Sequence, residues 1–306
     1  MDKTIKSSQS STSIVILTMN RSNHVKKVLN NISLQSVLPD EIIIVDNASE
    51  ETHRLKNMSI AKEYDADYFC MDKNLGVSGG RNFGLRKATG DIILEIDDDA
   101  EFESIDAIKK VVGYFESDKS IGLLAFSIFK NKNFDRRREE FPFFAKKRTL
   151  DSELIPCGWF IGAGHAFRGK IFEKINYYND FFPYGQEEID LSLRVIDSGY
   201  NIFFASEIKI FHYKTDDARY IPNIEMEALN LKNRVKVALL NLNIFSIFTY
   251  IVVRSLQYSL KCKTFKVVTL AYGMILKDLD YIRENRKVIS FKSYLKLIKI
   301  RGPILF

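Results

Sequence analysis

The chain has 306 residues, of which 46% are hydrophobic and 27% charged, enough for a globular protein with a sizeable core in one large or two smaller domains. Its three cysteines, Cys70, Cys157 and Cys262, form no metal-type pair, which argues against a disulfide scaffold and for a reducing compartment. The net charge of +6 is uneven, because residues 231–306 hold 15 Lys and Arg against 3 acidic residues. That segment has a net charge of +12 and the rest of the chain a net charge of −6, which indicates an acidic body with a basic tail.

The N-terminal half alternates short apolar strands with helices. Residues 1–12 are polar, lack the apolar core of a secretory signal and are expected to form a disordered lead-in. We expect buried strands over residues 13–18, 41–45, 67–71 and 91–96, with helices over 22–32, 51–64 and 76–90. Continuous apolar strands of this kind predict an α/β fold whose mostly parallel sheet is flanked by helices.

Each of these four strands ends in polar residues. The ends are T-M-N-R from Thr18, D-N from Asp46, D-K-N up to Asn74, and Asp97-Asp98-Asp99. Because the carboxyl ends of parallel strands meet at one edge of a sheet, we expect a ligand crevice there. Gly76 and the two glycines after it could let the backbone approach a phosphate, but their pattern is neither a dinucleotide fingerprint nor a P-loop.

The three consecutive aspartates at 97–99 repel one another. Such a run either faces solvent as a capped turn or holds a divalent cation through its carboxylate oxygens.

Four segments together indicate a protein family. SIVILTMNR, EIIIVDNAS, NLGVSGGRNFGL and ILEIDDDA resemble, in this order, the motifs of family 2 glycosyltransferases with the GT-A fold. The C-terminal extension is similar in character to those of bacterial rhamnosyl- and galactofuranosyltransferases. The resemblance implies that Asp46 contacts the nucleobase of a UDP- or dTDP-sugar, that Thr18 and Asn20 line the nucleoside pocket and that Arg81 lies near the nucleotide. The whole donor-binding set is expected to be Thr18, Asn20, Arg21, Asp46, Asn74, Gly76, Arg81, Asp97 and Asp98.

The same resemblance implies a metal site. Asp97 and Asp99 correspond to the D-x-D pair, with Asp99 on the metal and Asp97 nearer the ribose or the waters of the metal. Residues 201–205 and 208–211 are expected to form two strands, and His212 after them to complete the site for Mn²⁺ or Mg²⁺. Lys214 could neutralise the leaving diphosphate, whereas Asp98 is expected to point away and to matter least.

A general base is expected at the start of a helix over residues 187–198. An inverting transfer needs one carboxylate to take the proton of the acceptor hydroxyl. The stretch YGQEEIDLSLR resembles the family motif E-D-x-D-L-x-x-R, whose second acid is the base, and that position is Glu188 here. Because the family more often has Asp there, Asp190 and Glu187 remain alternatives. Acids in a first helical turn also suit the helix dipole, and Asp190 is expected to pair with Arg194.

Other segments suggest an acceptor side. Residues 104–116 and 121–129 are expected to form a helix and a strand, and the charged residues 131–154 either a solvated loop or a flap near the acceptor. In the stretch PCGWFIGAGHA, Gly162 would admit a sugar ring close to the backbone, and Trp159 would either stack on the sugar or lie in the core. Glu187 is expected on this side too.

The basic tail begins at about residue 224, where the amino-acid composition changes. We expect a catalytic domain over residues 13–223 and a basic amphipathic helical tail over 224–306, with a first helix at 225–240. The uncharged residues 237–253 fall short of the about 20 needed to span a bilayer. Residues 258–281 and 290–300 mix aromatic and aliphatic residues with Lys, which is typical of helices on an anionic membrane surface. The alternatives are a plain helical cap and, least favoured, a nucleic-acid site.

These observations predict an inverting, metal-assisted glycosyltransferase that acts on a hydroxyl of a growing, lipid-linked bacterial cell-surface glycan, at the inner face of the cell membrane. A homo-oligomer is left open. Two alternatives compete with this interpretation. One is a non-catalytic nucleotide-sugar-binding subunit of a glycan assembly complex, and the other is a nucleotidyltransferase, which would need a glycine-rich loop after the first strand.

Overall fold

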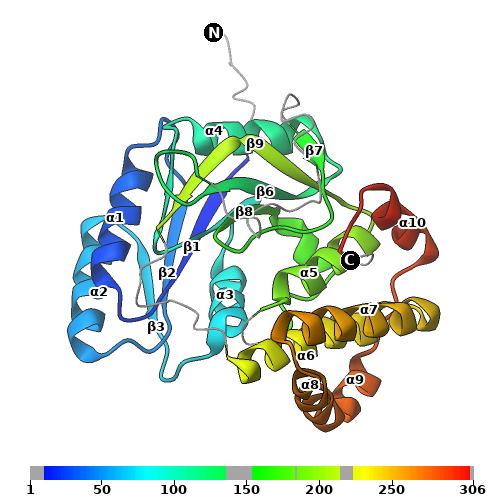
Figure 1. Ribbon diagram of the computed structural model, residues 1–306. Coiled ribbons are helices and arrows are strands. Elements are labelled where there is room, and N and C mark those ends of the chain that lie inside the picture. Colours follow the sequence, from blue (N-terminus) through cyan, green and yellow to red (C-terminus); the bar gives the residue numbers. More distant parts are fainter. Residues whose placement is uncertain (1–9, 136–153, 183–184, 214–222, 304–306) are drawn as a thin grey trace.

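The computed structural model describes residues 10–135, 154–182, 185–213 and 223–303. Within these ranges nine strands form one sheet in the order β3-β2-β1-β4-β8-β6-β9-β5, and β7 pairs with β9 (Figure 1). Most of the expected lead-in, most of the charged segment 131–154 and Lys214 lie outside the described residues.

The first half of the sheet is the expected parallel unit. Strand β1 (Thr12–Thr18) pairs in parallel with β2 (Glu41–Asp46) and β4 (Ile92–Asp97), and β2 pairs with β3 (Asp67–Cys70). The connections are α1 (Ser22–Ser33), α2 (Glu51–Glu63) and α3 (Gly76–Lys87). Thr18 faces Asp46 and Leu17 faces Asp97 in register, so the polar strand ends lie along one edge.

The second half of the sheet adds antiparallel strands to the expected, mostly parallel arrangement. Strand β8 (Gly164–Arg168) lies between β4 and β6 (Ile121–Phe129) and is antiparallel to both. Strand β9 (Asn201–His212) is parallel to β6 but antiparallel to β5 (Ala100–Phe102) and β7 (Leu154–Pro156). The sheet is therefore mixed. The three strands β5, β7 and β8 have five residues or fewer, which is too short for a periodicity that would have predicted them from the sequence.

Strand β9 is one strand where two were expected. Its pairing with β6 shifts register after Ala205 and resumes at Lys209, so residues 206–208 form an irregularity within the strand. Beyond it the strand continues to His212, which lies opposite Ala100 of β5. This pairing places the end of β9 beside the end of β4.

Helices cover both faces of the sheet. Ile14 and Ile16 of β1 belong to one buried cluster with α1 and α4 (Ala107–Ser117), whereas Val15 between them belongs to a second cluster with α3 and α5 (Glu187–Asp197). This alternation follows from the two faces of a strand. A short 3₁₀ helix, Gly169–Glu173, follows β8.

The described residues 223–303 form five helices: α6 (Ile224–Asn241), α7 (Ile244–Cys262), α8 (Lys266–Lys277), α9 (Leu279–Asn285) and α10 (Phe291–Lys299). The uncharged run 237–253 is divided between α6 and α7, because the Asn243 side chain accepts a hydrogen bond from the backbone of Ser246 and starts a new helix. In the described ranges, no helix combines the length and hydropathy that a membrane span requires.

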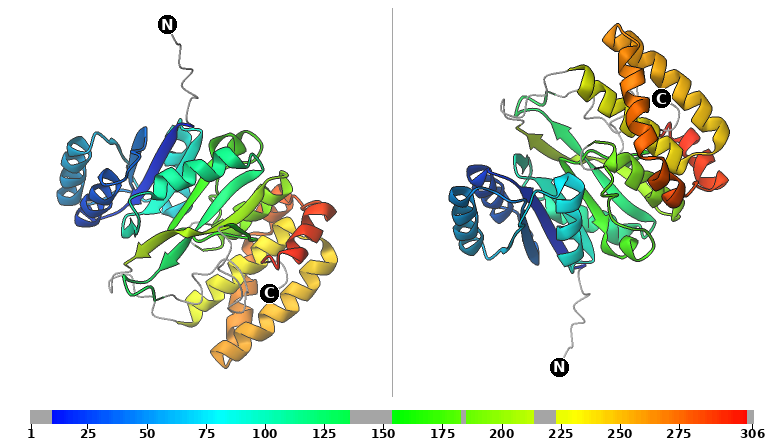
Figure 2. Two further views of the ribbon diagram at one scale, coloured as in Figure 1. Left: turned by 90° about the horizontal axis from the view of Figure 1, so that it is seen from above. Right: turned by 90° about the horizontal axis from the view of Figure 1, so that it is seen from below.

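The C-terminal helices gather at one end of the sheet, away from α1 and α2 (Figure 2). They are not a detached tail, because Leu231 and Val235 of α6 share one buried cluster with Phe182 and with Leu191 of α5. The body and the helical extension on either side of residue 223 therefore share a hydrophobic core.

Candidate active site

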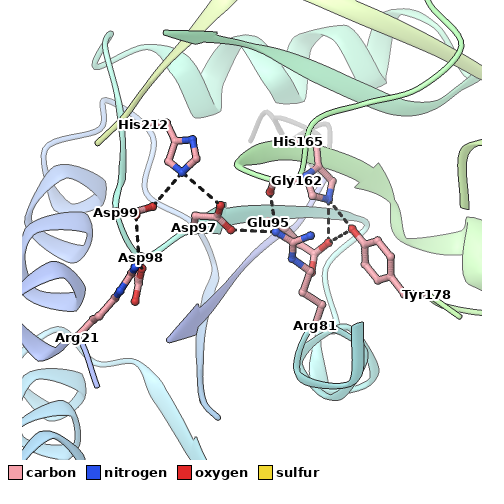
Figure 3. A network of polar contacts seen from close by, with 10 residues as sticks. All are labelled: Arg21, Arg81, Glu95, Asp97, Asp98, Asp99, Gly162, His165, Tyr178 and His212. Atoms are coloured by element: carbon pink, nitrogen blue, oxygen red, sulfur yellow. Dashed lines mark hydrogen bonds and ion pairs between the residues drawn. The ribbon is translucent and has the colours of Figure 1, made fainter. Parts of the chain in front are cut away.

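Two carboxylates and one imidazole converge where β4 and β9 end (Figure 3). His212 Nε2 lies 3.2 Å from Asp99 Oδ1 and 3.7 Å from Asp97 Oδ2. The other oxygen of each carboxylate meets an arginine, since Arg81 lies 2.9 Å from Asp97 Oδ1 and Arg21 lies 3.1 Å from Asp99 Oδ2. Burial favours protonation of Asp99, but the adjacent His212 and Arg21 overcome this effect and hold its pKa below the ordinary value.

The residues of this cluster fit a divalent ion. One ligand atom from each of Asp97, Asp99 and His212 lies within 4.8 Å of the others. Two carboxylate oxygens and an imidazole nitrogen form a donor set that suits Mn²⁺ or Mg²⁺. His212 is 7% exposed and its Nδ1 has no hydrogen-bond partner among the described residues, so the described residues alone leave this imidazole incompletely bonded.

Asp98 lies where the sequence did not place it. It does not point away, because Thr18 donates to its Oδ2 at 2.7 Å and Arg21 donates to its Oδ1 at 3.1 Å. Burial, which leaves Asp98 only 5% exposed, raises the pKa of its carboxyl to about 7. Strand alternation was a poor guide here, since β4 ends at Asp97 and the chain turns. Asp98 thus ties the end of β4 to the end of β1.

Asp46 also differs from expectation. It has no exposed surface, and its oxygens accept hydrogen bonds from the Ser49 backbone, from Asn57 at 2.8 Å and from the Tyr68 hydroxyl at 2.7 Å. In this structure the carboxylate therefore has three donors around it and no surface open to a nucleobase. We therefore interpret Asp46 as the residue that holds the turn after β2 in place.

The neighbouring strand ends form a second polar cluster. Asn20, at φ 59°, accepts at its side chain from the Glu50 backbone and donates its own backbone N–H to Ser49. Asn47, which was not among the expected site residues, donates to Asn74 at 2.9 Å and to the carbonyl of Gly76 at 3.1 Å. The polar end of β2 already contained Asn47, so its position was the available signal.

Two glycines of α3, Gly80 and Gly84, let the helix pack closely against β1. A Cβ on Gly80 would collide with Leu17, and one on Gly84 would collide with Val15, both on β1. Gly80 and Gly84 thus let α3 lie against the sheet and so position Arg81. Phosphate approach at Gly76, Gly79 and Gly80 stays a prediction.

Asp97, Asp99 and His212 are called the metal-type cluster below. Arg81 is the centre of a buried network beside this cluster (Figure 3). It is 5% exposed, and its Nη2 donates both to Asp97 and to the carbonyl of Gly162 at 2.9 Å. Its Nη1 has no partner among the described residues. Gly162 also adjoins Glu188, because a Cβ at Gly162 would stand 2.7 Å from Arg81 Nη1 and 2.8 Å from Glu188 Oε1. Arg81 thus connects the metal-type cluster with the expected base.

A buried triad lies beside Arg81. Glu95 Oε2 accepts from the Tyr178 hydroxyl at 2.6 Å and lies 2.8 Å from His165 Nε2, and all three residues are at most 3% exposed. Burial alone would raise the pKa of Glu95, but its hydrogen bond to His165 and the charges of His165 and Arg81 lower it. The Arg81 guanidinium lies 5.8 Å from the centre of the Tyr178 ring. No pattern in the sequence indicates this triad, since its members are separated by 13 to 83 residues.

The three acids at the start of α5 have different surroundings. Asp190 is 2% exposed and its oxygens are taken by Arg194, as expected, and by Asn241 at 2.9 Å. Glu187 is 3% exposed, and burial, aided by the negative charge of Glu188, raises its pKa to about 8. Glu188 is half-buried beside Gly162 and Arg81. Of the three, Glu188 therefore combines partial exposure with proximity to the cluster.

Helix α6 holds the segment that precedes these acids. Lys236 donates to the Phe181 carbonyl at 2.6 Å, and its ammonium lies 4.3 and 4.4 Å from the ring centres of Phe181 and Phe182. Tyr281 stacks on Phe181 with centroids 3.7 Å apart. On the opposite side, Ser78 of α3 donates to the Phe182 carbonyl. The helix that carries Arg81 and the C-terminal helices therefore hold this segment from both sides.

Trp159 is half-buried, three residues before Gly162. The preceding Gly158 lies against the C-terminal end of the described chain, since a Cβ there would meet Gly302 at 2.6 Å. A contact of Trp159 with a sugar stays a prediction.

Comparisons with known proteins agree with this geometry. The model of the family described as "Glycosyl transferase family 2" matches residues 13–176, which is more than half of the chain. An uncharacterized protein of Haemophilus influenzae is 38% identical over 141 residues, which cover 44% of this chain and 74% of that protein. The O-antigen chain rhamnosyltransferase RfbN of Salmonella typhimurium is 25% identical over 214 residues, covering 65% of each chain. The crystal structure of GalNAc-T7 with UDP, GalNAc and Mn²⁺ superposes with a TM-score of 0.67 at 16% identity, covering 97% of this chain and 59% of that one. A likeness at that identity concerns the GT-A fold.

Proposed function

The chain belongs to glycosyltransferase family 2, and from this premise we propose that it transfers a sugar from a UDP- or dTDP-sugar to an acceptor hydroxyl with inversion at the anomeric carbon. The observation that carries the proposal is the convergence of Asp97, Asp99 and His212 within reach of Arg81 and Glu188. The UDP and Mn²⁺ bound by GalNAc-T7, which shares the fold, support a nucleotide donor and a metal here.

The donor would bind along the polar strand ends. A Mn²⁺ or Mg²⁺ ion held by Asp97, Asp99 and His212 would supply positive charge to the diphosphate as it leaves. Arg21 and Arg81 are fixed by the same aspartates and add two permanent positive charges to this region. Thr18, Asn20 and Asn74 shape the floor on which the nucleoside would lie, through the hydrogen bonds that join the strand ends.

We assign the general base to Glu188. A base must be ionised and must reach the acceptor hydroxyl. Asp190 is engaged by Arg194 and Asn241 on both oxygens, and the raised pKa of Glu187 keeps that carboxyl largely protonated near neutral pH. Glu188 would take the acceptor proton while the anomeric carbon is attacked from the side opposite the leaving diphosphate.

The acceptor is proposed to be a growing, lipid-linked glycan of a bacterial cell surface. The similarity to RfbN, whose name describes O-antigen chain rhamnosyl transfer, supports this class of acceptor. The basic charge of residues 231–306 supports peripheral attachment to the anionic inner face of the cell membrane.

A thermal-shift screen of nucleotide sugars with and without Mn²⁺ tests the donor assignment. We expect one UDP- or dTDP-sugar to raise the melting temperature more with Mn²⁺ than without. Transfer by the Glu188→Gln and Asp190→Asn variants then tests the base. Loss of turnover in Glu188→Gln with donor binding retained supports the enzyme, whereas unchanged transfer would contradict the assignment. A chain that binds donor but transfers nothing to any acceptor would instead be a nucleotide-sugar-binding subunit.

A further inference from the structure

Helix α7 presents a long apolar face to its surroundings. Six of its large apolar side chains are between 42% and 84% exposed: Phe245, Phe248, Val252, Val253, Leu256 and Leu260. Their spacing of three and four residues places them on one side of the helix, while Ser246 and Arg254 on the other side are buried against the protein. Soluble proteins rarely expose so many large apolar side chains along one helix unless that face binds another protein or a membrane.

This face carries no charge along its length. The only charged residue between Ile244 and Leu260 is Arg254, which is 9% exposed and points inward with its guanidinium near the Tyr250 ring. Charged residues begin directly after it, at Lys261, Lys263 and Lys266, and all three are exposed. Phe265, which is 64% exposed, lies among these lysines. An apolar face that ends in a basic rim is the composition of helices that lie in the surface of an anionic bilayer.

A second apolar surface adjoins the start of α7. Helix α10 exposes Phe291 and Leu295 to 74% and 50%, and the Ser246 hydroxyl donates to Tyr294 of α10 at 2.8 Å. Both helices lie at the end of the molecule farthest from α1 and α2 (Figure 2). The sequence had pointed to residues 258–281 and 290–300 as the interfacial helices, but the structure puts the largest apolar exposure upstream, on α7.

We propose that the α7 face, Phe245 to Leu260, inserts into the surface of an anionic membrane, with Lys263 and Lys266 at the phospholipid head groups. The choice of lipid rests on the proposed lipid-linked acceptor and on charge. Two copies of the chain would bring two tails of +12 together, whereas an anionic bilayer is complementary to each. Docking by this face would hold the site at the ends of β4 and β9 at a fixed height above the membrane that carries the acceptor.

The test is co-sedimentation of the full chain with vesicles of equal parts phosphatidylcholine and phosphatidylglycerol, without nucleotide sugar. Replacing Phe245, Phe248 and Leu256 by Ser should lower the vesicle partition coefficient at least about 100-fold, since each side chain loses a favourable burial. The matched control replaces Leu38, Leu55 and Met58, which are 51% to 60% exposed on the catalytic body, by Ser and should leave the partition unchanged. Lys263→Asn with Lys266→Gln should weaken binding about 30-fold, and this difference should shrink at high salt.

Three results would overturn the proposal. They are equal partition of the α7 variant and the wild type, an equal loss in the control variant, and a wild-type dimer that the α7 substitutions convert to a monomer while vesicle binding persists. Hydrolysis of the nucleotide sugar in vesicle-free solution separates this inference from the proposed function. If the α7 variant hydrolyses donor normally but vesicle binding never depended on α7, the docking face is wrong and the proposed activity stands.

Discussion

Gly162→Ala is the substitution with the clearest geometric consequence for the site. An added Cβ would stand 2.7 and 2.8 Å from the two terminal nitrogens of Arg81 and 2.8 Å from Glu188 Oε1, whereas ordinary contact begins at 3.4 Å. These atoms must therefore retreat by up to 0.7 Å. Arg81 is 5% exposed and held by Asp97 and by the Gly162 carbonyl at 2.9 Å, so a retreat of this size breaks or stretches both hydrogen bonds.

The expected cost follows from those bonds. A hydrogen bond from a charged group contributes about 1.5–3 kcal/mol, so the free energy of unfolding should fall by about 2–4 kcal/mol. Displacement of Glu188 and Arg81 by a large fraction of an ångström should lower kcat by about 10- to 100-fold, because reacting groups tolerate little misplacement. Chemical denaturation measures the first effect, and release of nucleoside diphosphate in the presence of acceptor measures the second.

Gly113→Ala is the matched control. Gly113 lies inside α4, and a Cβ there would meet nothing within 4 Å. The substitution should leave kcat unchanged and stabilise the protein by about 0.5–1 kcal/mol, since Ala loses less backbone entropy than Gly in a helix. If Gly162→Ala matched the wild type in both stability and kcat, the close approach of Arg81 and Glu188 to Gly162 would be refuted.

Two further substitutions test the acids of α5 and their support. Because burial raises the pKa of Glu187 from 4.5 to about 8, the folded state binds the extra proton, and stability should decline as pH rises through that window. As the pH rises from 4.5 to 8, the melting temperature of Glu187→Gln should therefore increase relative to that of the wild type. A difference that stays constant over this range would refute the raised pKa of Glu187. Lys236→Met leaves the Phe181 carbonyl without its donor and should cost about 1–3 kcal/mol of stability and lower kcat more than KM. Lys232→Met, which loses its 2.9 Å pair with Asp278, should show little loss of kcat, and equal losses in both would contradict a role for Lys236 in positioning α5.

The parallel half of the fold could be predicted from local sequence patterns, and the metal-type cluster from the resemblance to the family motifs. Apolar runs ending in polar residues predict β1, β2, β3 and β4 within one or two residues. Topology then brings the strand ends together, and the family motifs single out Asp97, Asp99 and His212. The structure places their ligand atoms together, although the pairing of β5 with β9 that achieves this was not foreseen.

The remainder depends on contacts that leave no local trace. The family resemblance implied that Asp46 contacts a nucleobase, but in the structure Asn57 and Tyr68 donate hydrogen bonds to its buried carboxylate. The triad of Glu95, His165 and Tyr178 assembles only when β8 enters the sheet between β4 and β6. The contact of Lys236 with Phe181 joins residues 55 apart and shows that the basic tail also holds the segment that precedes α5.

The most direct test of the central claim is the Mn²⁺ dependence of nucleoside diphosphate release from the UDP- or dTDP-sugar proposed as the donor. We predict that Asp99→Asn abolishes Mn²⁺-stimulated release while the melting temperature remains high enough for a folded protein at the assay temperature. Asp280→Asn, which alters a carboxylate that is 92% exposed on α9, should behave as the wild type. Turnover and Mn²⁺ stimulation that survive intact in Asp99→Asn would contradict a metal site at Asp97, Asp99 and His212.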